Sequence, residues 1–365
     1  MSYSPVGFEK SVLDTPALLV DLDQMERNIA RIASRCRECG VDWRPHTKGN
    51  KIPAIAHKLV SAGAVGITCA KLGEAEVMAA AGIQDILVAN QIVGDQKIAR
   101  LVNLQRHASV MVAVDHPHHI GAISEAARDL GAKVRVLVEI DVGMQRCGVE
   151  PGKPALELAQ QAEAAPGVIF AGIMGYEGHA MDLPDEEKEA ACARSMDLLA
   201  QTAIHIQASG LEVGIVSAGG TGTLAFTPAL PGVTEIQAGG GILMDTFYPN
   251  DLGVKGLEQA LTILATVVSH PAADRAVIDA GRKTTSAQFR LPEVTGREGV
   301  TVQALSAEHG TLSLDGPGTS LKIGEKIELI SGYSDMTVFL HDRLYGTRNN
   351  RIEVVWDILG RGKLQ

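Results

Sequence analysis

Short, apolar, β-rich runs alternate with helical patterns along residues 41–242 of this 365-residue chain, and this alternation constrains its fold most. Strands are expected near residues 41–46, 65–69, 86–90, 109–115, 134–141, 168–176, 213–217 and 233–238. Amphipathic stretches lie between them, such as residues 73–81, 119–130, 155–164 and 186–209. Near-continuous apolar strands separated by helices indicate a parallel sheet covered on its faces. About eight such units predict an α/β fold with a closed (β/α)₈ barrel of the TIM type.

A doubly wound open sheet is the alternative α/β fold. It would need a glycine-rich phosphate fingerprint directly after its first strand. Here the first predicted strand runs into Arg44–Lys51, which contains no such fingerprint.

The pattern changes after about Asp251. β-type segments then recur without helices between them, at residues 261–269, 275–279, 300–305, 311–314, 326–330, 337–341 and 352–357. Turn signals such as Asp-Gly-Pro-Gly at 315–318 separate them, as in an antiparallel β-domain. An opening strand at 17–21 precedes a helix at 22–37 and is a candidate to pair with this domain. We therefore predict two domains, a barrel over 26–250 and a β-domain over 1–25 plus 251–365.

Composition excludes some classes of partner. The net charge is 33 − 43 = −10, which argues against binding to nucleic acid or to an anionic membrane surface. No apolar run approaches the ~18 residues of a membrane span. The N-terminal sequence lacks the basic and apolar regions of a signal peptide. Five cysteines, an odd number in a long chain, indicate reduced thiols, so we expect a cytoplasmic protein.

Lys48 follows the first predicted barrel strand, within the cationic segment Arg44–Lys51. In a (β/α)₈ barrel, functional residues gather on the loops at the C-terminal ends of the strands. A lysine there is well placed to hold a carbonyl cofactor as a Schiff base. A solvated cationic loop would also explain this segment taken alone, so the loops after later strands must decide.

Two glycine-rich loops follow the seventh and eighth predicted strands. Their residues are Ser217, Gly219, Gly220, Thr221 and Gly222 in the first loop and Gly239, Gly240 and Gly241 in the second. Glycines let backbone N–H groups approach an anion closely, and serine or threonine hydroxyls add donors. Barrels commonly bind phosphate at these two strand ends. Either loop alone could be a tight turn, but together they predict a phosphate site.

A phosphate site facing a lysine across a barrel mouth indicates pyridoxal 5′-phosphate as the cofactor. Lys48 would hold its aldehyde carbon, with Lys51 as a solvated neighbour. Arg146, in the loop after the fifth strand, could donate to the phenolic oxygen of the cofactor. Tyr176, after the sixth strand, is a candidate to flank the ring, although a tyrosine that lines a barrel is equally often structural.

The chain resembles the alanine-racemase-like, fold-type III pyridoxal-phosphate enzymes, and within them the group of D-threonine aldolase, D-serine dehydratase and 3-hydroxy-D-aspartate aldolase. The segments that carry the resemblance are DTPALLVDLD (15–24), RPHTKGNK (44–51), EIDVGMQRCGV (139–149), GYEGH (175–179), SAGGTG (217–222), EIQAGGGILMD (235–245), VIDAG (277–281) and HDRLYGTRNNRIEVVW (341–356). The resemblance implies a barrel plus β-domain, chemistry on D-amino acids, and a head-to-tail homodimer with its active site at the subunit interface. It also implies that Lys48 binds the cofactor, that Arg146 lies near its O3′, and that the glycine loops hold its phosphate.

Two positions refine this resemblance. Where racemases place an arginine beside the pyridine nitrogen, this chain has Gln237. A neutral amide does not stabilise a pyridinium, which suits bond cleavage or elimination at least as well as racemisation. Glu139 stands where many racemases have a lysine that supports the arginine, so a Glu139–Arg146 ion pair is expected.

The resemblance also implies a metal pair, His-x-Asp or His-x-Cys, late in the β-domain. The matching run here is residues 331–337, in which Asp335 is present and Tyr333 replaces the histidine. A neutral phenol is a poorer metal ligand than imidazole. A divalent metal, Mn²⁺ or Mg²⁺ rather than Zn²⁺, is therefore left open at Asp335.

We predict an aldolase that cleaves D-3-hydroxy-amino acids, of the D-threonine or 3-hydroxy-D-aspartate type, to glycine and an aldehyde or glyoxylate. The β-hydroxyl proton would pass to metal-bound water or to one of three histidines, His46, His179 and His341. A dehydratase that acts on D-serine or D-3-hydroxyaspartate and releases a 2-oxo acid and ammonia is the alternative. An amino-acid racemase and a non-catalytic cofactor carrier are further hypotheses, and the large β-domain argues against the carrier.

Overall fold

The computed structural model describes residues 4–365, and these divide into two compact units. The barrel unit comprises Arg31–Lys48, Pro53–Gly239 and Gly362–Gln365. The β-sheet unit comprises the described residues up to Ala30, together with Gly49–Ile52 and Gly240–Arg361.

The barrel unit contains eight parallel strands in the order β2-β9-β8-β7-β6-β5-β4-β3. They are β2 (Asp42–Trp43), β3 (Ile67–Cys69), β4 (Asp85–Val88), β5 (Ser109–Val114), β6 (Val134–Glu139), β7 (Val168–Met174), β8 (Ile215–Ala218) and β9 (Glu235–Ile236). The two ends of this order meet at a parallel bridge between His46 and Thr68, which closes the barrel. The predicted (β/α)₈ architecture is confirmed.

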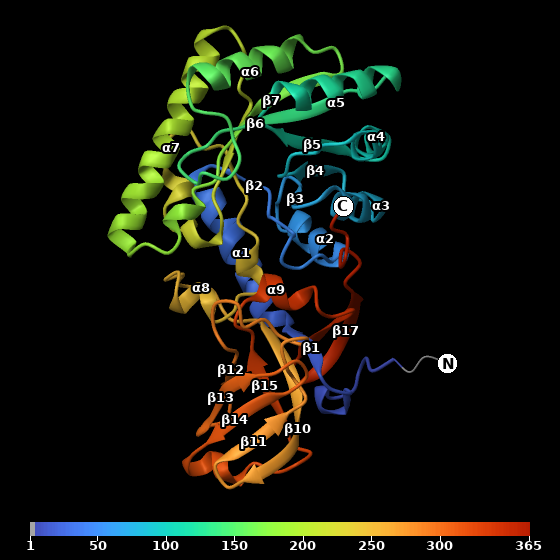
Figure 1. Cartoon of the computed structure of the whole chain (residues 1–365), viewed down its shortest axis with the longest axis vertical. Coiled ribbons are helices and arrows are strands. Elements are labelled where there is room, and N and C mark those ends of the chain that lie inside the picture. The colour runs from blue at the N-terminus through green and yellow to red at the C-terminus, as the bar shows by residue number, and fades with distance from the viewer. Residues whose placement is uncertain (1–3) are drawn as a thin grey trace. The chain divides into compact units, whose positions relative to one another are not determined.

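One α-helix follows each of β2 to β7 and covers the outside of the sheet, as Figure 1 shows for α4 to α7. They are α2 (Pro53–Ser61), α3 (Leu72–Ala80), α4 (Asp95–Leu104), α5 (Pro117–Asp129), α6 (Lys153–Ala164) and α7 (Asp185–Ala208). The strands are buried on both faces, because helices cover one face and apolar side chains fill the other. Leu87, Met111, Leu137 and Met174 pack together in one such cluster. Burial on both faces explains why these strands are continuously apolar.

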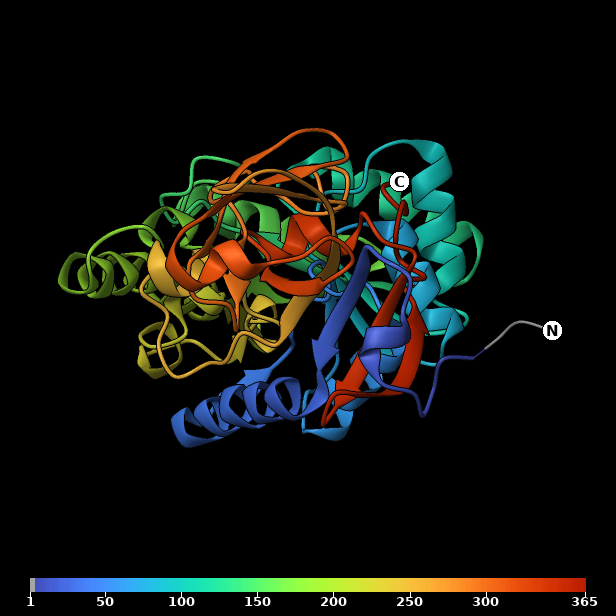
Figure 2. The same cartoon turned by 90° about the horizontal axis from the view of Figure 1, so that it is seen from below.

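The β-sheet unit is built on nine strands whose main order is β13-β14-β11-β10-β1-β16-β17, with β15 joining β10 and β12 joining β15. They are β1 (Ala17–Asp21), β10 (Leu261–Ala272), β11 (Arg275–Ile278), β12 (Glu293–Thr295), β13 (Val300–Leu305), β14 (Gly310–Leu314), β15 (Lys326–Ile330), β16 (Arg343–Arg348) and β17 (Arg351–Asp357). All pairings are antiparallel except that of β1 with β16. Figure 2 shows β1, in blue, beside the red C-terminal strands, so the opening strand does pair with the C-terminal sheet.

Helices α1 (Leu22–Cys39), α8 (Phe247–Asn250) and α9 (Ser334–Val338) complete the main elements. The strand predicted at 337–341 is wrong, because the chain there is α9 followed by a turn. Side-chain hydrogen bonds favour the helical turn: Thr337 Oγ1 donates to the Tyr333 carbonyl (2.9 Å) and lies 2.6 Å from Ser331 Oγ. Alternation over only five residues does not decide between helix and strand.

Within residues 4–365, none of the helices combines the length and the apolar composition that crossing a bilayer would require.

Candidate active site

Lys48 lies just beyond β2, in a segment held on both sides by neighbouring strand ends. The His46 N–H donates to the Gln237 carbonyl (3.0 Å), and the Thr47 N–H donates to the Thr68 carbonyl (2.7 Å). The Lys48 side chain is exposed, whereas Thr47 is buried. The backbone that carries Lys48 is therefore fixed by the barrel itself.

His46 also contributes its side chain to this turn. The Lys48 N–H donates to His46 Nδ1 at 3.3 Å, so this ring nitrogen acts as an acceptor. The basic nitrogen of His46 is thus engaged with the backbone next to Lys48.

A chain of buried polar side chains crosses the barrel interior and ends at Gln237. Arg44 Nε donates to Glu235 Oε2 (2.7 Å), and both side chains are at most 4% exposed. Ser217 Oγ donates to Glu235 Oε1 (2.7 Å) and accepts from Gln237 Nε2 (3.0 Å). A carboxylate only accepts hydrogen bonds, so the Ser217 hydroxyl donates its proton to Glu235. The Ser217 oxygen then accepts from Gln237, which must turn the NH₂ group of its amide toward Ser217. The side-chain oxygen of Gln237, Oε1, can therefore accept from another donor.

The loop after β6 carries Arg146 and is pinned by two aspartates. Asp141 Oδ1 accepts the N–H groups of Gly143 (2.9 Å) and Gln145 (3.0 Å). Asp115 Oδ2 accepts the Gly148 N–H (2.9 Å) at the far end of the loop. These bonds fix the loop on both sides of Arg146.

Asp115 is itself oriented by its neighbours. His119 Nδ1 lies 3.3 Å from Asp115 Oδ1, and this contact is the main reason that the pKa of Asp115 is lowered. Gln91 Nε2 lies 3.3 Å from Asp115 Oδ2 and donates to Glu139 Oε2 at 2.5 Å. Gln91 thus bridges the two carboxylates that face the loop.

The expected pair between Glu139 and Arg146 is present, with Oε1 and Nη2 3.9 Å apart. Burial raises the pKa of the Glu139 carboxyl, and the hydrogen bond from Gln91 and the charge of Arg146 oppose this effect. The Arg146 guanidinium carbon also lies 5.7 Å from the centre of the Tyr176 ring, which places two predicted cofactor residues together.

A buried carboxylate organises the first glycine-rich loop. Glu177 is fully buried, and its Oε1 accepts the hydroxyls of Thr223 and Thr227, both at 2.6 Å. Its Oε2 accepts the Gly219 N–H at 3.3 Å. The Gly220 N–H donates in turn to Thr223 Oγ1 (3.2 Å). The N–H groups of both glycines are therefore used to shape the loop.

Glycine is required at two positions of this region. Gly219 has φ +77°, in the left-handed region that glycine favours. A Cβ on Gly239 would collide with the backbone of His46, because the ends of β2 and β9 approach closely there. A side chain on Gly239 would therefore separate the two strand ends beneath Lys48.

Other predicted residues flank these loops. Tyr176 Oη donates to Met181 Sδ at 3.0 Å, and a Cβ on Gly220 would lie 3.2 Å from the Tyr176 ring. The exposed ring of His179 lies against Gly143, on the Arg146 loop, where an added Cβ would come within 2.8 Å of His179 Cε1.

The remaining predicted residues belong to the β-sheet unit. Gly240 lies against the Tyr248 hydroxyl, where a Cβ would clash, and Gly241 is buried beside it in the chain. His341 is half-buried, its Nε2 lies 2.8 Å from the Thr284 carbonyl, and partial burial lowers its pKa.

Lys51 is only 9% exposed, so the prediction that it is a solvated neighbour of Lys48 is wrong. Its φ of +56° is a left-handed value, and its carbonyl accepts the Gly360 N–H at 3.0 Å. The backbone turns at this residue and carries the side chain inward.

The segment expected to bind metal lies in the same unit. Tyr333 Oη donates to Asp335 Oδ2 at 3.3 Å. Within residues 4–365, no cluster of three or more His, Cys, Asp or Glu side chains is arranged to hold a metal ion.

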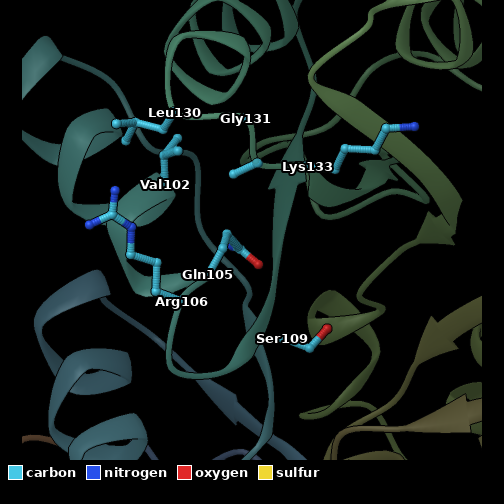
Figure 3. Close-up of a pocket in the computed structure, with 8 residues that line it drawn as sticks. Val102, Gln105, Arg106, Ser109, Leu130, Gly131 and Lys133 are labelled. Atoms are coloured by element: carbon cyan, nitrogen blue, oxygen red, sulfur yellow. The ribbon is translucent and has the colours of Figure 1, made fainter.

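A hollow of about 400 Å³ lies at the N-terminal ends of β5 and β6, away from the residues described above. Its lining is Val102, Gln105, Arg106, Ser109, Leu130, Gly131, Ala132 and Lys133. Figure 3 shows the Arg106 and Lys133 side chains pointing in different directions, so the two cations do not converge on one ligand. Gln105 Nε2 is bonded to the Val110 carbonyl (2.9 Å). This hollow has no grouping of reactive side chains.

Three polar residues that organise the candidate site were not predicted: Glu177, Asp115 and Gln91. Glu177 lies next to Tyr176 in the GYEGH segment, and Asp115 ends the predicted strand 109–115. Their positions at the ends of predicted strands could have identified both as candidate site residues. Gln91 lies beyond the end of β4, and only the folded structure shows its two carboxylate partners.

Comparison with known proteins identifies the family of the chain. The family "Alanine racemase, N-terminal domain" matches residues 20–246, and a domain of the D-serine dehydratase type matches residues 260–347. A D-threonine aldolase from an Arthrobacter species is 38% identical, over 96% of this chain and 93% of its own length. A 3-hydroxy-D-aspartate aldolase from Paracoccus denitrificans is 36% identical, over 98% and 94%.

A crystal structure of D-threonine aldolase from Filomicrobium marinum superposes with a TM-score of 0.96 at 37% identity, covering 99% of this chain and all of the other. Both the sequence matches and this structural match extend over essentially the whole chain. The chain therefore belongs to the alanine-racemase-like, fold-type III family of pyridoxal-phosphate proteins, and aldolases are among its relatives.

Proposed function

We propose that this protein is a pyridoxal-phosphate-dependent lyase that cleaves D-3-hydroxy-amino acids to glycine and an aldehyde, or glyoxylate where the substrate carries a β-carboxylate. The observation that carries the proposal is that Lys48, the Arg146 loop and the glycine loop all follow the C-terminal ends of parallel strands of the barrel unit, namely β2, β6 and β8. The relatives at 36–38% identity, named as aldolases of two such substrates, support it.

The residues present fit the cofactor. Lys48 is exposed, Arg146 offers a cation for the phenolic oxygen, and the glycine-rich loop that Glu177 shapes lacks side chains that would keep a phosphate away from the backbone. The side-chain amide oxygen of Gln237, oriented by the hydrogen bond from Nε2 to Ser217, can accept from a ring N–H group but carries no charge to offset a pyridinium. When bound, the cofactor would supply the electron sink that bond cleavage at Cα requires.

The protein's own residues would then bind and orient the substrate and move one proton. Cleavage of the Cα–Cβ bond needs a base for the β-hydroxyl proton. His179 is the better candidate, because its ring is exposed beside the Arg146 loop. His46 is less suited, because its Nδ1 accepts the Lys48 N–H.

The match of residues 260–347 to a D-serine dehydratase-type domain keeps β-elimination as the second candidate reaction. The two reactions differ in products: glycine with an aldehyde, or a 2-oxo acid with ammonia.

The test is to incubate the cofactor-loaded protein with D-threonine, D-threo-3-hydroxyaspartate, D-phenylserine and D-serine and to identify the products by mass. We expect glycine with an aldehyde or glyoxylate from at least one of the first three. Ammonia and a 2-oxo acid would indicate the dehydratase, and the absence of any aldehyde from all four would refute the aldolase.

The homodimer, with an active site at its interface, and the cytoplasmic location remain predictions from the sequence. A mass measurement in solution by light scattering tests the first.

A further inference from the structure

The segment Ser331–Thr337 of the β-sheet unit departs from the metal-binding pattern that the family resemblance implies. Tyr333 stands at the position of the expected histidine, and Asp335 keeps the carboxylate. The structure shows what the tyrosine does there, and its contacts do not suit a metal ligand.

The Tyr333 ring is part of an aromatic cluster. It meets Phe289 edge-on, with ring centres 5.1 Å apart and planes at 76°, and meets Phe247 in the same way at 5.7 Å and 77°. Phe247 and Phe289 are stacked on each other at 4.2 Å. Edge-to-face contacts of this kind fix the orientation of a ring. The phenol is thus held in place by apolar packing.

The Tyr333 hydroxyl is directed at the carboxylate. It donates to Asp335 Oδ2 at 3.3 Å, so it carries its proton and is a neutral phenol. A neutral phenol is a weak ligand for divalent cations, whereas imidazole suits Mn²⁺ and its neighbours better. A metal ion at Oδ2 would have to displace this hydrogen bond.

The other side of Asp335 is crowded. Its Oδ1 lies so close to Gly49 that a Cβ there would collide with it, and the side chain as a whole is 8% exposed. A hard divalent cation needs about six oxygen ligands in an open shell. With Gly49 packed against Oδ1, a metal ion would have to be held through Oδ2, the oxygen that accepts from Tyr333.

The neighbouring carboxylate, Asp245, is already used by the backbone. Its Oδ2 accepts the Ser334 N–H (2.7 Å) and its Oδ1 accepts the Tyr248 N–H (2.9 Å). Asp245 therefore supports the turn that carries Asp335 and does not supply a second ligand.

We propose that the Tyr333–Asp335 hydrogen bond replaces the metal pair in this chain, so that the protein neither retains nor requires a divalent metal ion. The identity of residue 333 decides this property, because the Tyr333 hydroxyl occupies the Oδ2 atom of Asp335. The proposal rests on the proposed function only for the claim about requirement, and the claim about binding stands without it.

The test measures metal binding directly. Mn²⁺ is titrated into chelator-treated full-length protein, and free Mn²⁺ is followed by electron paramagnetic resonance. Four proteins are compared: the wild type, Tyr333→Phe, Tyr333→His, and a double variant with Tyr333→His and Asp335→Asn. We expect no site in the wild type or Tyr333→Phe and a new site in Tyr333→His, with an affinity at least about tenfold higher than the wild type's. The added Asp335→Asn should remove that gain.

One bound Mn²⁺ per chain in the wild type would overturn the proposal, as would a Tyr333→His variant that folds and binds no more tightly. If that variant does not fold, measurements on the wild type still test the proposal. The melting temperature of the wild type and its rate of aldehyde release should be unchanged after chelation, and a loss of either that Mn²⁺ restores would refute the proposal. If no substrate yields an aldehyde, the proposed function fails while the titration still reports on the metal.

Discussion

Glu177 allows a quantitative prediction, because a single carboxylate holds three donors of the first glycine-rich loop. We expect Glu177→Gln to loosen this loop without unfolding the barrel. The amide oxygen can keep the two threonine hydroxyls, but each bond loses its charge assistance, at a cost of about 0.5–1 kcal/mol per bond. The amide NH₂ then faces the Gly219 N–H, and that bond, worth ~1.5 kcal/mol, is lost.

These terms sum to about 3 kcal/mol. A neutral amide is easier to bury than a carboxylate, which offsets part of the loss, so we expect about 2 kcal/mol in the local opening of the loop. Since 1.4 kcal/mol is a factor of ten, the amides of residues 217–227 should exchange roughly 30 times faster with deuterium.

The assay is hydrogen–deuterium exchange with mass spectrometry on the cofactor-free protein, alongside a titration of pyridoxal phosphate. Glu187→Gln is the matched control, since Glu187 is exposed on the first turn of α7. We expect weaker cofactor binding and faster exchange only in the Glu177 variant. Unchanged exchange at residues 217–227, or an equal increase throughout the barrel, would show that Glu177 does not organise the loop.

Three further outcomes are expected. Lys48→Ala should abolish the yellow absorbance of the cofactor-loaded protein, whereas Lys97→Ala, an exposed lysine on α4, should leave the spectrum unchanged. Ser217→Ala removes the hydroxyl between Gln237 and Glu235 and should lower the free energy of unfolding in urea by ~1–3 kcal/mol. Burial raises the pKa of Asp245 from 3.8 to about 6, so the folded state binds more protons than the unfolded state between these values. The free energy of unfolding should therefore fall by about 3 kcal/mol as pH rises from about 4 to 6, and Asp245→Asn should lack this fall.

The sequence was most informative where one physical pattern dominated. Strands such as β5 and β6 are buried on both faces, which leaves a continuous apolar run that periodicity detects. Positions such as Lys48 and Gly219 followed from the rule that parallel strands end on one side of a barrel. The hydrogen-bond partners of these loops could not be predicted in this way. The bond from Thr227 to Glu177, for example, joins residues 50 positions apart and forms only once the loops have folded.

Two errors have a common physical origin. The turn at Tyr333–Thr337 and the inward course of Lys51 are both set by local backbone geometry, through a threonine side chain in one case and a positive φ in the other. Composition and hydrophobic period contain little information about either. At Thr337 the missing variable is a side-chain hydrogen bond to the backbone, and at Lys51 it is the left-handed backbone conformation.

The position of β1 between β10 and β16 has a consequence for how the protein is made. A ribosome releases Ala17–Asp21 more than 300 residues before β16 emerges, since their sequence positions differ by 343 − 21 = 322. The nascent strand must wait for both neighbours with its hydrogen-bonding edges unpaired, a state prone to aggregation. The segment Pro53–Gly239, by contrast, is contiguous and can begin to collapse early. Holding factors that bind nascent chains should therefore matter most for the first two dozen residues.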